Sequence, residues 1–331
     1  MNKKAIALIS GGLDSLLAAK VVMGQGIEVL GVVFVMQFAS RDVQVFREHV
    51  QDAAASAGIP VKFVDISKEF FEVLKAPRYG YGSNLNPCID CRILMLGLAK
   101  KIMREEGAGF VITGEVLGER PMSQRKEALN MIAKRSSLEG YLLRPLSAKL
   151  FKETVPEEQG IIDRTKLLDI TGRSRQRQLN LAGEYGLHRF FAPAGGCLLT
   201  DPIFARKLKD LMSKGSLTMD DAALLKYGRH FRLDDETKAV VGRNEKDNRE
   251  MQVLKKEDDV MLRLKGAPGP YTLLRGKTSL ENLEKAASLV VSHSRSKNMD
   301  GSAIEFWADE KDRKPLIAGP MARDEIERLR V

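Results

Sequence analysis

Cysteine spacing is the first sign of chemistry in this chain. The sequence has three cysteines: Cys88 and Cys91 are separated by two residues, and Cys197 lies far along the chain. Three thiols cannot close a set of disulfides, and in a reducing compartment a C-x-x-C pair favours metal, cluster or sulfur chemistry. Apolar residues with helical spacing follow Cys91. We therefore expect both thiols at a helix N-terminus, where thiolates are stabilised.

Three uses of the thiols stay open. A zinc site would need a fourth ligand, for which His188 is a candidate. A [4Fe-4S] cluster can be held by three cysteines, which leaves one iron free to bind sulfide. Without a metal, one cysteine would carry a persulfide and another would resolve the disulfide that follows. The alternative without function is three ordinary thiols, with Cys197 buried in the core.

A glycine-rich segment, Ser-Gly-Gly-Leu-Asp-Ser, begins at Ser10 and ends at Ser15, after an apolar run and before a helical pattern. Gly11 and Gly12 let the backbone turn tightly and approach a phosphate, and the new helix presents free N–H groups. The two serines add hydroxyl donors, and Asp14 can cap the helix or help hold Mg²⁺. The segment is neither G-x-x-x-x-G-K-[ST] nor G-x-G-x-x-G. The alternative is a capped turn without a ligand.

The elements that position these groups alternate between strand and helix. Buried strands are expected at residues 5–9, 29–35, 61–64, 110–114 and 141–143. Helical patterns lie between them, for example at residues 43–57. This alternation predicts an α/β fold with a doubly wound, Rossmann-like parallel sheet. Ligands of such sheets bind beyond the carboxyl ends of the strands, where the motifs of this chain lie.

The pattern changes at Thr200-Asp201-Pro202, which predicts a catalytic domain over residues 1–200 and a smaller α+β domain over residues 201–331. In the second domain, helices are expected up to about residue 227 and at 280–291, and strands at 250–254, 260–264, 271–274 and 303–307. Basic residues gather around the later elements: Arg263, Lys265, Arg275, Lys277, Arg295 and Lys297. They are compatible with a polyanionic partner. The alternative is a dimerisation or packing domain.

Composition excludes several classes of protein. The chain has 331 residues with 44% hydrophobic and 29% charged residues, a globular balance that excludes a disordered or fibrous chain. The longest apolar stretch, residues 27–36, is too short for a membrane helix, and the first residues do not form a signal peptide. We therefore expect a cytoplasmic protein. The net charge of +9 is compatible with a polyanionic partner.

Two basic patches are local. One consists of Arg120, Arg125, Lys126, Lys134 and Arg135, and the other of Arg164, Lys166, Arg173, Arg175 and Arg177. The alternative for each is a solvated helix face.

These motifs resemble known families. The loop that begins at Ser10 resembles that of the ATP pyrophosphatase (PP-loop) superfamily, whose members cleave ATP between the α and β phosphates and adenylate a substrate. Three segments, Thr-Gly-Glu-Val-Leu-Gly from Thr113, Ser123-Gln124 and Arg144-Pro145-Leu146, resemble the catalytic domain of the tRNA 4-thiouridine synthetase family over about residues 1–200. The segment around Cys88 is similar to tRNA 2-thiouridylases and cluster-containing thiolases. In the later domain, the Lys-Gly-Ala-Pro-Gly-Pro turn from Lys265, the strand that ends at Arg275 and the Ser-Arg-Ser-Lys run from Ser294 resemble a small RNA-binding domain of ribosome-quality-control proteins. This resemblance implies RNA binding through phosphate contacts and RNA shape.

The resemblance implies an ATP-dependent tRNA thiolase that forms 4-thiouridine at position 8. It implies contacts to ATP, with the adenine near Phe34, from Ser10, Gly11, Gly12, Asp14, Ser15, Phe34, Thr113 and Gly114. It implies chemistry at Cys88, Cys91, Cys197, Asp14 and Glu115, of which Glu115 organises a metal or the flipped base. It implies tRNA contacts from Arg120, Gln124, Arg125, Arg173, Arg175 and Arg177.

For the sulfur we favour a [4Fe-4S] cluster on Cys88, Cys91 and Cys197 over a persulfide. The cluster would use every cysteine of the chain, and we find no other sulfur-carrying domain. The expected partners are ATP, Mg²⁺, tRNA and a sulfur donor, either a cysteine desulfurase or inorganic sulfide; a homodimer is compatible with the sequence. The sequence departs from the synthetases in two ways. Those enzymes carry an RNA-binding module before the catalytic domain, and some carry a rhodanese-type domain after it. We recognise neither module here.

Two other classes of function remain. One is ATP-dependent sulfur transfer to a small molecule or a protein thiocarboxylate. The other is a nucleotide-binding or RNA-binding protein without chemistry, in which the cysteines hold zinc.

Overall fold

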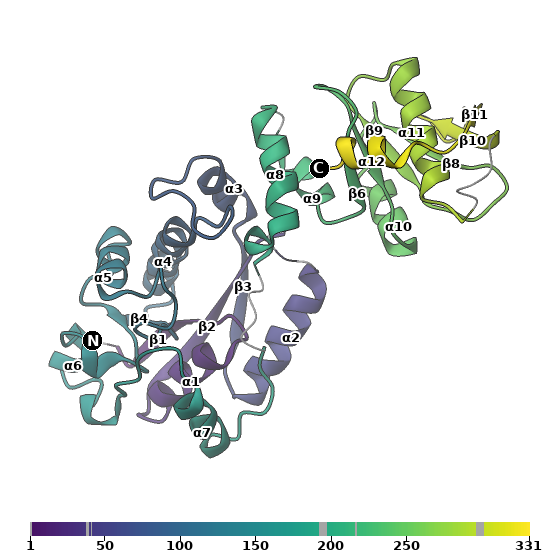
Figure 1. The fold of residues 1–331 in the computed structure, drawn as a ribbon. Coiled ribbons are helices and arrows are strands. Elements are labelled where there is room, and N and C mark those ends of the chain that lie inside the picture. The colour runs from purple at the N-terminus through teal and green to yellow at the C-terminus, as the bar shows by residue number, and fades with distance from the viewer. Residues whose placement is uncertain (1, 38–39, 41, 192–196, 216, 296–300) are drawn as a thin grey trace. The chain divides into compact units, whose positions relative to one another are not determined.

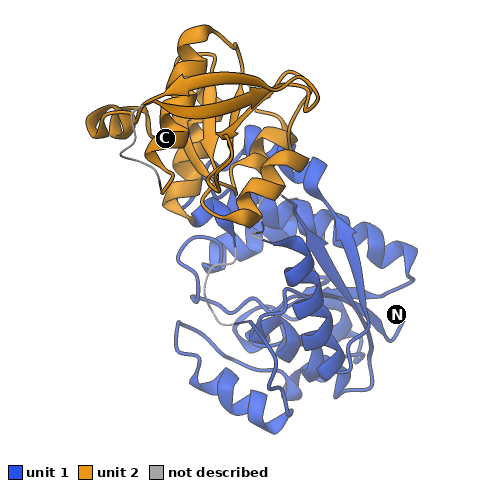
Figure 2. Cartoon of the chain, turned by 90° about the vertical axis from the view of Figure 1, so that its right-hand side faces the viewer, with its two compact units in different colours: residues 1–200 blue, residues 201–331 orange. Residues whose placement is uncertain are grey.

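The computed structural model describes residues 2–331 except residues 38–39, 41, 192–196, 216 and 296–300. The chain forms two compact units, residues 1–200 and residues 201–331 (Figure 2). Each unit has its own sheet and its own core. Among the described residues, no helix combines the length and the apolar composition that crossing a membrane requires.

Unit 1 is built on a five-stranded sheet with the order β3-β2-β1-β4-β5, in which all pairs are parallel. The strands are β1 (Lys4–Leu8), β2 (Glu28–Val35), β3 (Val61–Asp65), β4 (Phe110–Ile112) and β5 (Leu142–Leu143). The strand order reverses between β1 and β4, which places the topological switch point at their carboxyl ends. The expected doubly wound α/β fold is confirmed.

Helices cover both faces of this sheet. They are α1 (Leu13–Met23), α2 (Val43–Ser56), α3 (Ser67–Lys75), α4 (Cys88–Glu105), α5 (Lys126–Arg135), α6 (Val155–Glu158) and α7 (Gln176–Glu184), with 3-10 turns η1 (Ala148–Leu150), η2 (Arg164–Lys166) and η3 (Leu198–Thr200). Successive side chains of a strand point to opposite faces. Accordingly, Ala5 and Ala7 pack with α1, α2 and α7, whereas Ile6 packs with α4 and α5. Figure 1 shows the two groups of helices on opposite sides of the sheet.

Unit 2 is the smaller α+β domain that the sequence predicts. Its six-stranded sheet has the order β11-β10-β8-β9-β7-β6, in which all pairs are antiparallel. The strands are β6 (Arg229–Arg232), β7 (Lys238–Val241), β8 (Val260–Leu264), β9 (Thr272–Arg275), β10 (Ser302–Trp307) and β11 (Lys314–Ala318). The helices are α8 (Pro202–Ser213), α9 (Met219–Leu224), α10 (Glu245–Val253), α11 (Leu280–Ser292) and α12 (Arg323–Leu329). Helix α11 packs on one face of the sheet, and α9 and α10 pack on the other.

One expected strand of unit 2 is wrong. Residues 250–254 belong to the end of α10 and the residue that follows it. Asn244 caps this helix by accepting a hydrogen bond from Asp247 N–H, and the acidic residues of the first turn favour the positive end of the helix dipole. Strands β6, β7 and β11 were not expected, because their short runs carry basic residues and show no clear alternation.

The basic cluster expected in unit 2 is partly used inside the domain. The Arg275 guanidinium donates to Asp221 at 2.6 Å and to Asp259 at 2.6 Å, so it is half-buried between two carboxylates. Arg263 is paired with Glu305 at 3.2 Å. Lys265, Lys277 and Arg295 are exposed, and Lys297 lies outside the described residues. Only part of the predicted cluster therefore faces solvent.

Candidate nucleotide and thiol site

The glycine-rich loop connects β1 to α1 at the switch point. The Ser15 hydroxyl holds it from the inside, because Oγ donates to the Gly12 carbonyl at 2.8 Å and accepts from Ser10 N–H at 3.2 Å. Ser10 is exposed, whereas Ser15 is buried. No side chain caps the first turn of α1. The N–H groups that begin this helix are therefore free to bind an anion.

Gly114 packs directly on this loop. A Cβ built on Gly114 would lie 2.5 Å from the carbonyl carbon of Asp14 and 2.5 Å from the nitrogen of Ser15. Both contacts are to backbone atoms, which cannot rotate away. The end of β4 and the start of α1 can approach this closely only because residue 114 is a glycine.

Glu115, the next residue, lies in a buried ion network. Its carboxylate is 1% exposed; Oε2 accepts from Arg144 Nε at 2.9 Å and from Thr113 Oγ1 at 3.1 Å, and Oε1 lies 3.5 Å from Arg92 Nη1. Burial alone would raise the pKa of Glu115, but the guanidiniums of Arg144 and Arg92 outweigh it and hold the pKa below the usual range. The predicted role of Glu115 with a metal or base remains untested, and the structure adds a positioning role toward Arg92, which follows Cys91.

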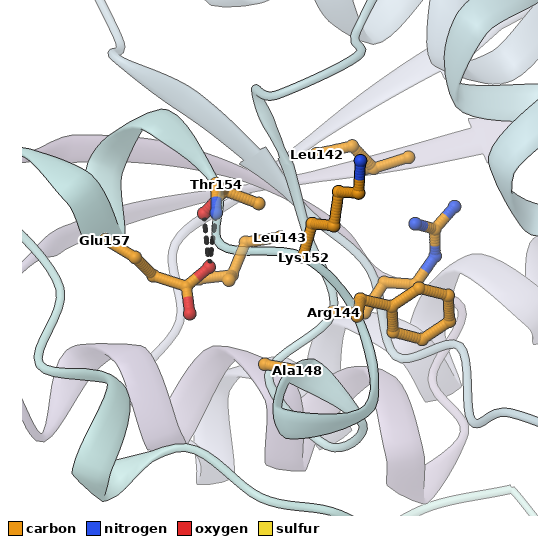
Figure 3. Close-up of a pocket in the computed structure, with 8 residues that line it drawn as sticks. Leu142, Leu143, Arg144, Ala148, Lys152, Thr154 and Glu157 are labelled. Atoms are coloured by element: carbon orange, nitrogen blue, oxygen red, sulfur yellow. Dashed lines mark hydrogen bonds between the residues drawn. The ribbon is translucent and has the colours of Figure 1, made fainter.

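A narrow pocket lies beside Arg144, and Figure 3 shows the residues that line it. The Arg144 guanidinium sits 5.4 Å from the Phe151 ring centroid and donates to the Leu129 carbonyl at 2.9 Å. Glu157 on the far wall accepts from Thr154 N–H and Oγ1. The polar groups of Arg144, Thr154 and Glu157 are thus bonded to other groups of the protein. The pocket borders the Arg144 end of the ion network.

Both cysteines of the C-x-x-C pair lie in the first turn of α4, which begins at Cys88. The expected helix N-terminus is thus confirmed. Between them, the Asp90 carboxylate accepts from the backbone N–H groups of Arg78 at 3.1 Å and Tyr79 at 3.0 Å, which fixes the loop that leads into the helix.

The distant Cys197 is brought to the same place by two hydrogen bonds. Leu85 N–H donates to the Leu199 carbonyl at 3.2 Å, and Asn84 Nδ2 donates to the Thr200 carbonyl at 2.8 Å. Thr200 in turn donates to the carbonyl of Cys197 from N at 3.1 Å and from Oγ1 at 2.7 Å. The three thiols are close enough that Cys88 and Cys197 both influence the titration of Cys91.

The expected stabilisation of the thiolate by the helix N-terminus does not hold for Cys91. Burial raises the pKa of Cys91 to about 12, although the Arg92 guanidinium opposes it. Burial also raises the pKa of Cys197. Loss of hydration outweighs the helix N-terminus, because a buried thiolate has no solvent to stabilise it.

Three thiols are the donor type that an iron–sulfur cluster takes. Within the described residues, however, no group of three or more Cys, His, Asp or Glu side chains has an arrangement that could hold a metal ion. His188, the candidate fourth zinc ligand, is exposed. Residues 194–196, which precede Cys197, lie outside the described residues.

The segment before Cys197 also contacts the phosphate loop. Phe191 N–H donates to the Gly11 carbonyl at 2.8 Å, and the Phe191 ring stacks on His49 of α2 with centroids 4.0 Å apart. Gly11 has φ +75°, and a Cβ there would lie 2.7 Å from the Phe191 ring. Sequence reasoning missed Phe191 and His49, because no local pattern links them to the loop.

Charged groups surround Asp14. Its Oδ2 lies 3.7 Å from Arg175 Nη2, and burial raises the pKa of Asp14 while Arg175 and Arg120 oppose the rise. Burial and the nearby Asp14 charge raise the pKa of Glu119. Sequence reasoning missed Glu119 as a second carboxylate here; its only local signal is the acid that ends the Thr-Gly-Glu-Val-Leu-Gly-Glu run.

The structure sorts the expected tRNA contacts. Arg120, Arg125 and Arg173 are exposed, as is Arg177, which is also paired with Asp169 at 2.8 Å. Two others turn inward: Gln124 is 3% exposed, and Arg175 reaches Asp14. Those two side chains are therefore not offered to an RNA backbone.

Two expected nucleotide contacts are largely covered. Phe34 is 8% exposed and packs in the core beside α4, and Thr113 is 2% exposed and donates to Glu115. Stacking of adenine on Phe34 stays a prediction, and the face left for it is small.

Comparisons with known proteins agree with this geometry. Residues 1–156 match the family described as "Thiamine biosynthesis protein (ThiI)". The amino-terminal domain is a ThiI-like PP-loop domain. Residues 228–330 match the "NFACT protein RNA binding domain", so the second unit carries an NFACT-type domain.

Curated relatives match about a third of the chain. The tRNA-specific 2-thiouridylase MnmA of Pelobacter propionicus is 34% identical over 119 residues, which cover 34% of this chain and 33% of that protein. MnmA of Sulfurimonas denitrificans is 31% identical over 121 residues, which cover 35% of this chain and 36% of that protein. The chain thus spans about a third of the length of these relatives.

Among solved structures, a 4-thiouridine synthetase–RNA complex with bound ATP is 24% identical, covers 55% of this chain and 51% of that chain, and has a TM-score of 0.36. The U34-tRNA thiolase NcsA from Methanococcus maripaludis, with its [4Fe-4S] cluster, is 15% identical, covers 68% of this chain and 71% of that chain, and has a TM-score of 0.33.

Proposed function

We propose that this protein is an ATP-dependent tRNA uridine thiolase, a sulfurtransferase that releases AMP and pyrophosphate. The observation that carries the proposal is that the segments on either side of Cys197 bond to the phosphate loop and to the loop before the C-x-x-C helix. Phe191 N–H bonds to Gly11 of the loop, and Leu85 N–H bonds to Leu199 beside the distant thiol. The ThiI-like domain and the similarity to tRNA 2-thiouridylases support the assignment.

The first step activates the uridine, because a carbonyl oxygen is a poor leaving group and AMP is a good one. The uridine carbonyl oxygen attacks the α-phosphate of ATP, the bond to the β-phosphate oxygen breaks, and pyrophosphate leaves. The free N–H groups at the start of α1 and the exposed Ser10 hydroxyl bind phosphate oxygens. Mg²⁺ near Asp14 would offset the negative charge on the phosphates.

The second step replaces AMP with sulfur. In the persulfide route, the terminal sulfur on one cysteine attacks the activated carbon, and AMP leaves with the former carbonyl oxygen. A second cysteine thiolate then attacks the cysteine-bound sulfur, and the S–S bond breaks. The terminal sulfur stays on the base, and the two cysteines form a disulfide that a thiol reductant returns to the thiols.

We favour a [4Fe-4S] cluster over this persulfide route. Cys88, Cys91 and Cys197 would be its ligands, and the iron without a cysteine would present sulfide to the activated base. The hydrogen bonds from Asn84 and Leu85 to the segment after Cys197 support a shared site for the three thiols. The sulfur would come from a cysteine desulfurase or inorganic sulfide.

We place the product at position 8 of tRNA, as 4-thiouridine, because the run that begins at Thr113 resembles the 4-thiouridine synthetases. The match of residues 228–330 to an RNA-binding domain family supports tRNA as the partner. A homodimer stays a prediction.

The decisive experiment uses protein purified without oxygen, with ATP, Mg²⁺, sulfide and an unmodified tRNA transcript. The transcript is digested, and its nucleosides are compared with 4-thiouridine and 2-thiouridine standards by chromatography and mass spectrometry. A transcript with cytidine at position 8 is the matched control. We expect 4-thiouridine from the first transcript only, together with AMP. 2-Thiouridine would contradict the product, and the absence of both thiouridine and AMP would contradict the thiolase.

A further inference from the structure

Three side chains beside the phosphate loop leave buried polar atoms without a hydrogen-bond partner. They are Oδ1 of Asp14, Nε of Arg175, and both amide atoms of Gln178. Gln178 is 0% exposed, so no solvent reaches its amide. Buried polar groups are almost always hydrogen-bonded, and each exception needs an explanation. Three such side chains in one place indicate a site in which a polar ligand supplies the missing hydrogen-bond partners.

Two of these side chains come from the start of α7, far from any nucleotide motif in the sequence. Arg175 is the N-cap residue of α7, and Gln178 lies in the first turn of the helix. Helix α7 packs against α1, the helix that follows the phosphate loop (Figure 1). Burial raises the pKa of Asp14, and the nearby Arg175 guanidinium and Gln178 amide oppose this rise.

The chain before α7 is fixed in place. Gly172 N–H donates to the Leu117 carbonyl at 2.8 Å, and Thr171 Oγ1 donates to the same oxygen at 2.9 Å. Leu117 belongs to the run that continues from Gly114, which itself packs on the loop. The position of Arg175 is therefore set by the same elements that form the nucleotide loop.

The geometry points to one ligand chemistry. The Arg175 guanidinium lies 3.7 Å from Asp14, too far for a good hydrogen bond, so most of its N–H groups are left for another acceptor. Arginine is suited to phosphate because its planar fork binds two oxygens at once. The neighbouring loop offers the free N–H groups of α1, which also favour an anion.

We propose that Arg175 and Gln178 bind the β- and γ-phosphates of the nucleoside triphosphate, the pyrophosphate that leaves, and not the backbone of tRNA. This inference rests on the proposed use of ATP. Arg175 would then not belong with Arg173 and Arg177 among the residues expected to contact tRNA. Arg173 is exposed and only two residues away, so it serves as the control position.

The test measures binding of ATP, pyrophosphate and AMP, each with Mg²⁺, to the full-length protein by calorimetry. For Arg175→Gln we expect ATP and pyrophosphate binding to weaken about tenfold or more, as loss of a charge-assisted hydrogen bond predicts. AMP lacks both terminal phosphates, so its affinity should change less than about twofold. Arg173→Gln should bind ATP like the wild type.

Gln178→Met distinguishes a role in ATP binding from a role in packing. Methionine has a similar shape and no amide, so the ligand-free protein should keep or raise its Tm while ATP binding weakens. Arg175→Lys keeps the positive charge, so it should bind ATP more tightly than Arg175→Gln and more weakly than the wild type. It replaces Arg175→Gln in the test if that variant does not fold.

Equal weakening of ATP and AMP, or unchanged ATP binding in folded Arg175 variants, overturns the inference. A loss of tRNA affinity in Arg175→Gln equal to that in Arg173→Gln, with ATP binding intact, assigns Arg175 to RNA instead. A wild-type protein that binds neither ATP nor pyrophosphate overturns the proposed function as well.

Discussion

Gly114 lies against the backbone of Asp14 so closely that a Cβ on Gly114 would stand 2.5 Å from the Asp14 carbonyl oxygen. This contact joins β4 to the phosphate loop, and Glu115 next to it joins β4 to the thiol helix through Arg92. Two consecutive residues thus connect the nucleotide loop with the C-x-x-C helix.

Gly114→Ala should damage the phosphate loop. Because the added methyl group meets backbone on α1, the loop must shift, at a cost of about 1–3 kcal/mol in the free energy of unfolding. ATP binding measured by calorimetry should weaken with it. Gly97→Ala is the matched control: Gly97 lies inside α4 with open space around it, and alanine there should stabilise the protein by about 0.5–1 kcal/mol. An ATP affinity that is equal in the two variants would contradict this role of Gly114.

Glu115→Gln should destabilise unit 1, because it leaves the partly buried Arg92 and buried Arg144 without their shared carboxylate. We expect a loss of about 3–5 kcal/mol in urea unfolding. Glu72→Gln, which breaks the exposed pair with Lys75, should cost about 1 kcal/mol or less. Similar losses in the two variants would contradict a buried network.

The Glu115 network should also depend on pH. The folded pKa of Glu115 is lowered, so its contribution is present above the unfolded value of about 4.3 and is lost as pH falls through the lower folded pKa. The difference in unfolding free energy between wild type and Glu115→Gln should therefore shrink in acid. A difference that grows as pH falls from 5 would show that the carboxylate is not held ionised by its arginines.

Cys197→Ser should abolish thiolation but keep tRNA-dependent pyrophosphate release, because the thiols act after the uridine is activated. Iron and acid-labile sulfide, measured on protein purified without oxygen, separate the two sulfur routes. Wild-type protein with iron, and Cys197→Ser without it, would support the cluster. Iron-free protein that thiolates tRNA would contradict it and favour the persulfide. Normal thiolation by Cys197→Ser would exclude both routes.

Asn84 should matter for sulfur transfer through its bond to Thr200. It has φ +57°, a left-handed conformation that asparagine tolerates better than most residues. Asn84→Gly keeps this backbone and loses only the bond, whereas Asn84→Ala also adds strain of about 1–2 kcal/mol. Both variants should slow thiolation, with pyrophosphate release unchanged, and only the alanine variant should lose stability appreciably. If Asn84→Gly thiolates at the wild-type rate, the bond to Thr200 is not needed to hold the thiols together.

Lys265 and Lys277 are exposed in the NFACT-type domain and should contact RNA phosphates. Changing each to Gln should weaken tRNA binding and lower the slope of log K against log salt by about 1 per residue. Lys314→Gln is the control, because that lysine is exposed but already paired with Asp312 at 3.1 Å. If Lys314→Gln lowers the slope by the same amount, Lys265 and Lys277 do not contact RNA more than other exposed lysines do.

Much of the fold is predictable from local pattern. The apolar run that becomes β1, the glycines that follow it and the helical spacing of α1 are short-range features, so periodicity alone locates the phosphate loop. The same reasoning failed at residues 250–254, where an asparagine cap six residues upstream makes the segment helical. It also missed β6, β7 and β11, whose short runs show no clear alternation. Strand β7 pairs with the distant β9, whereas β6 and β11 are edge strands that each pair with the neighbouring strand along the chain.

The site divides in the same way. The sequence by itself determined the loop that begins at Ser10 and the placement of Cys88 at a helix start, because each depends on neighbours along the chain. Tertiary structure alone decided that the segment after Cys197 bonds to the loop before the C-x-x-C helix, that Gly114 must be a glycine, and that Arg175 faces Asp14 while Arg173 faces solvent. These relationships depend on contacts between segments far apart in the chain, which only the packed sheet and its helices bring together.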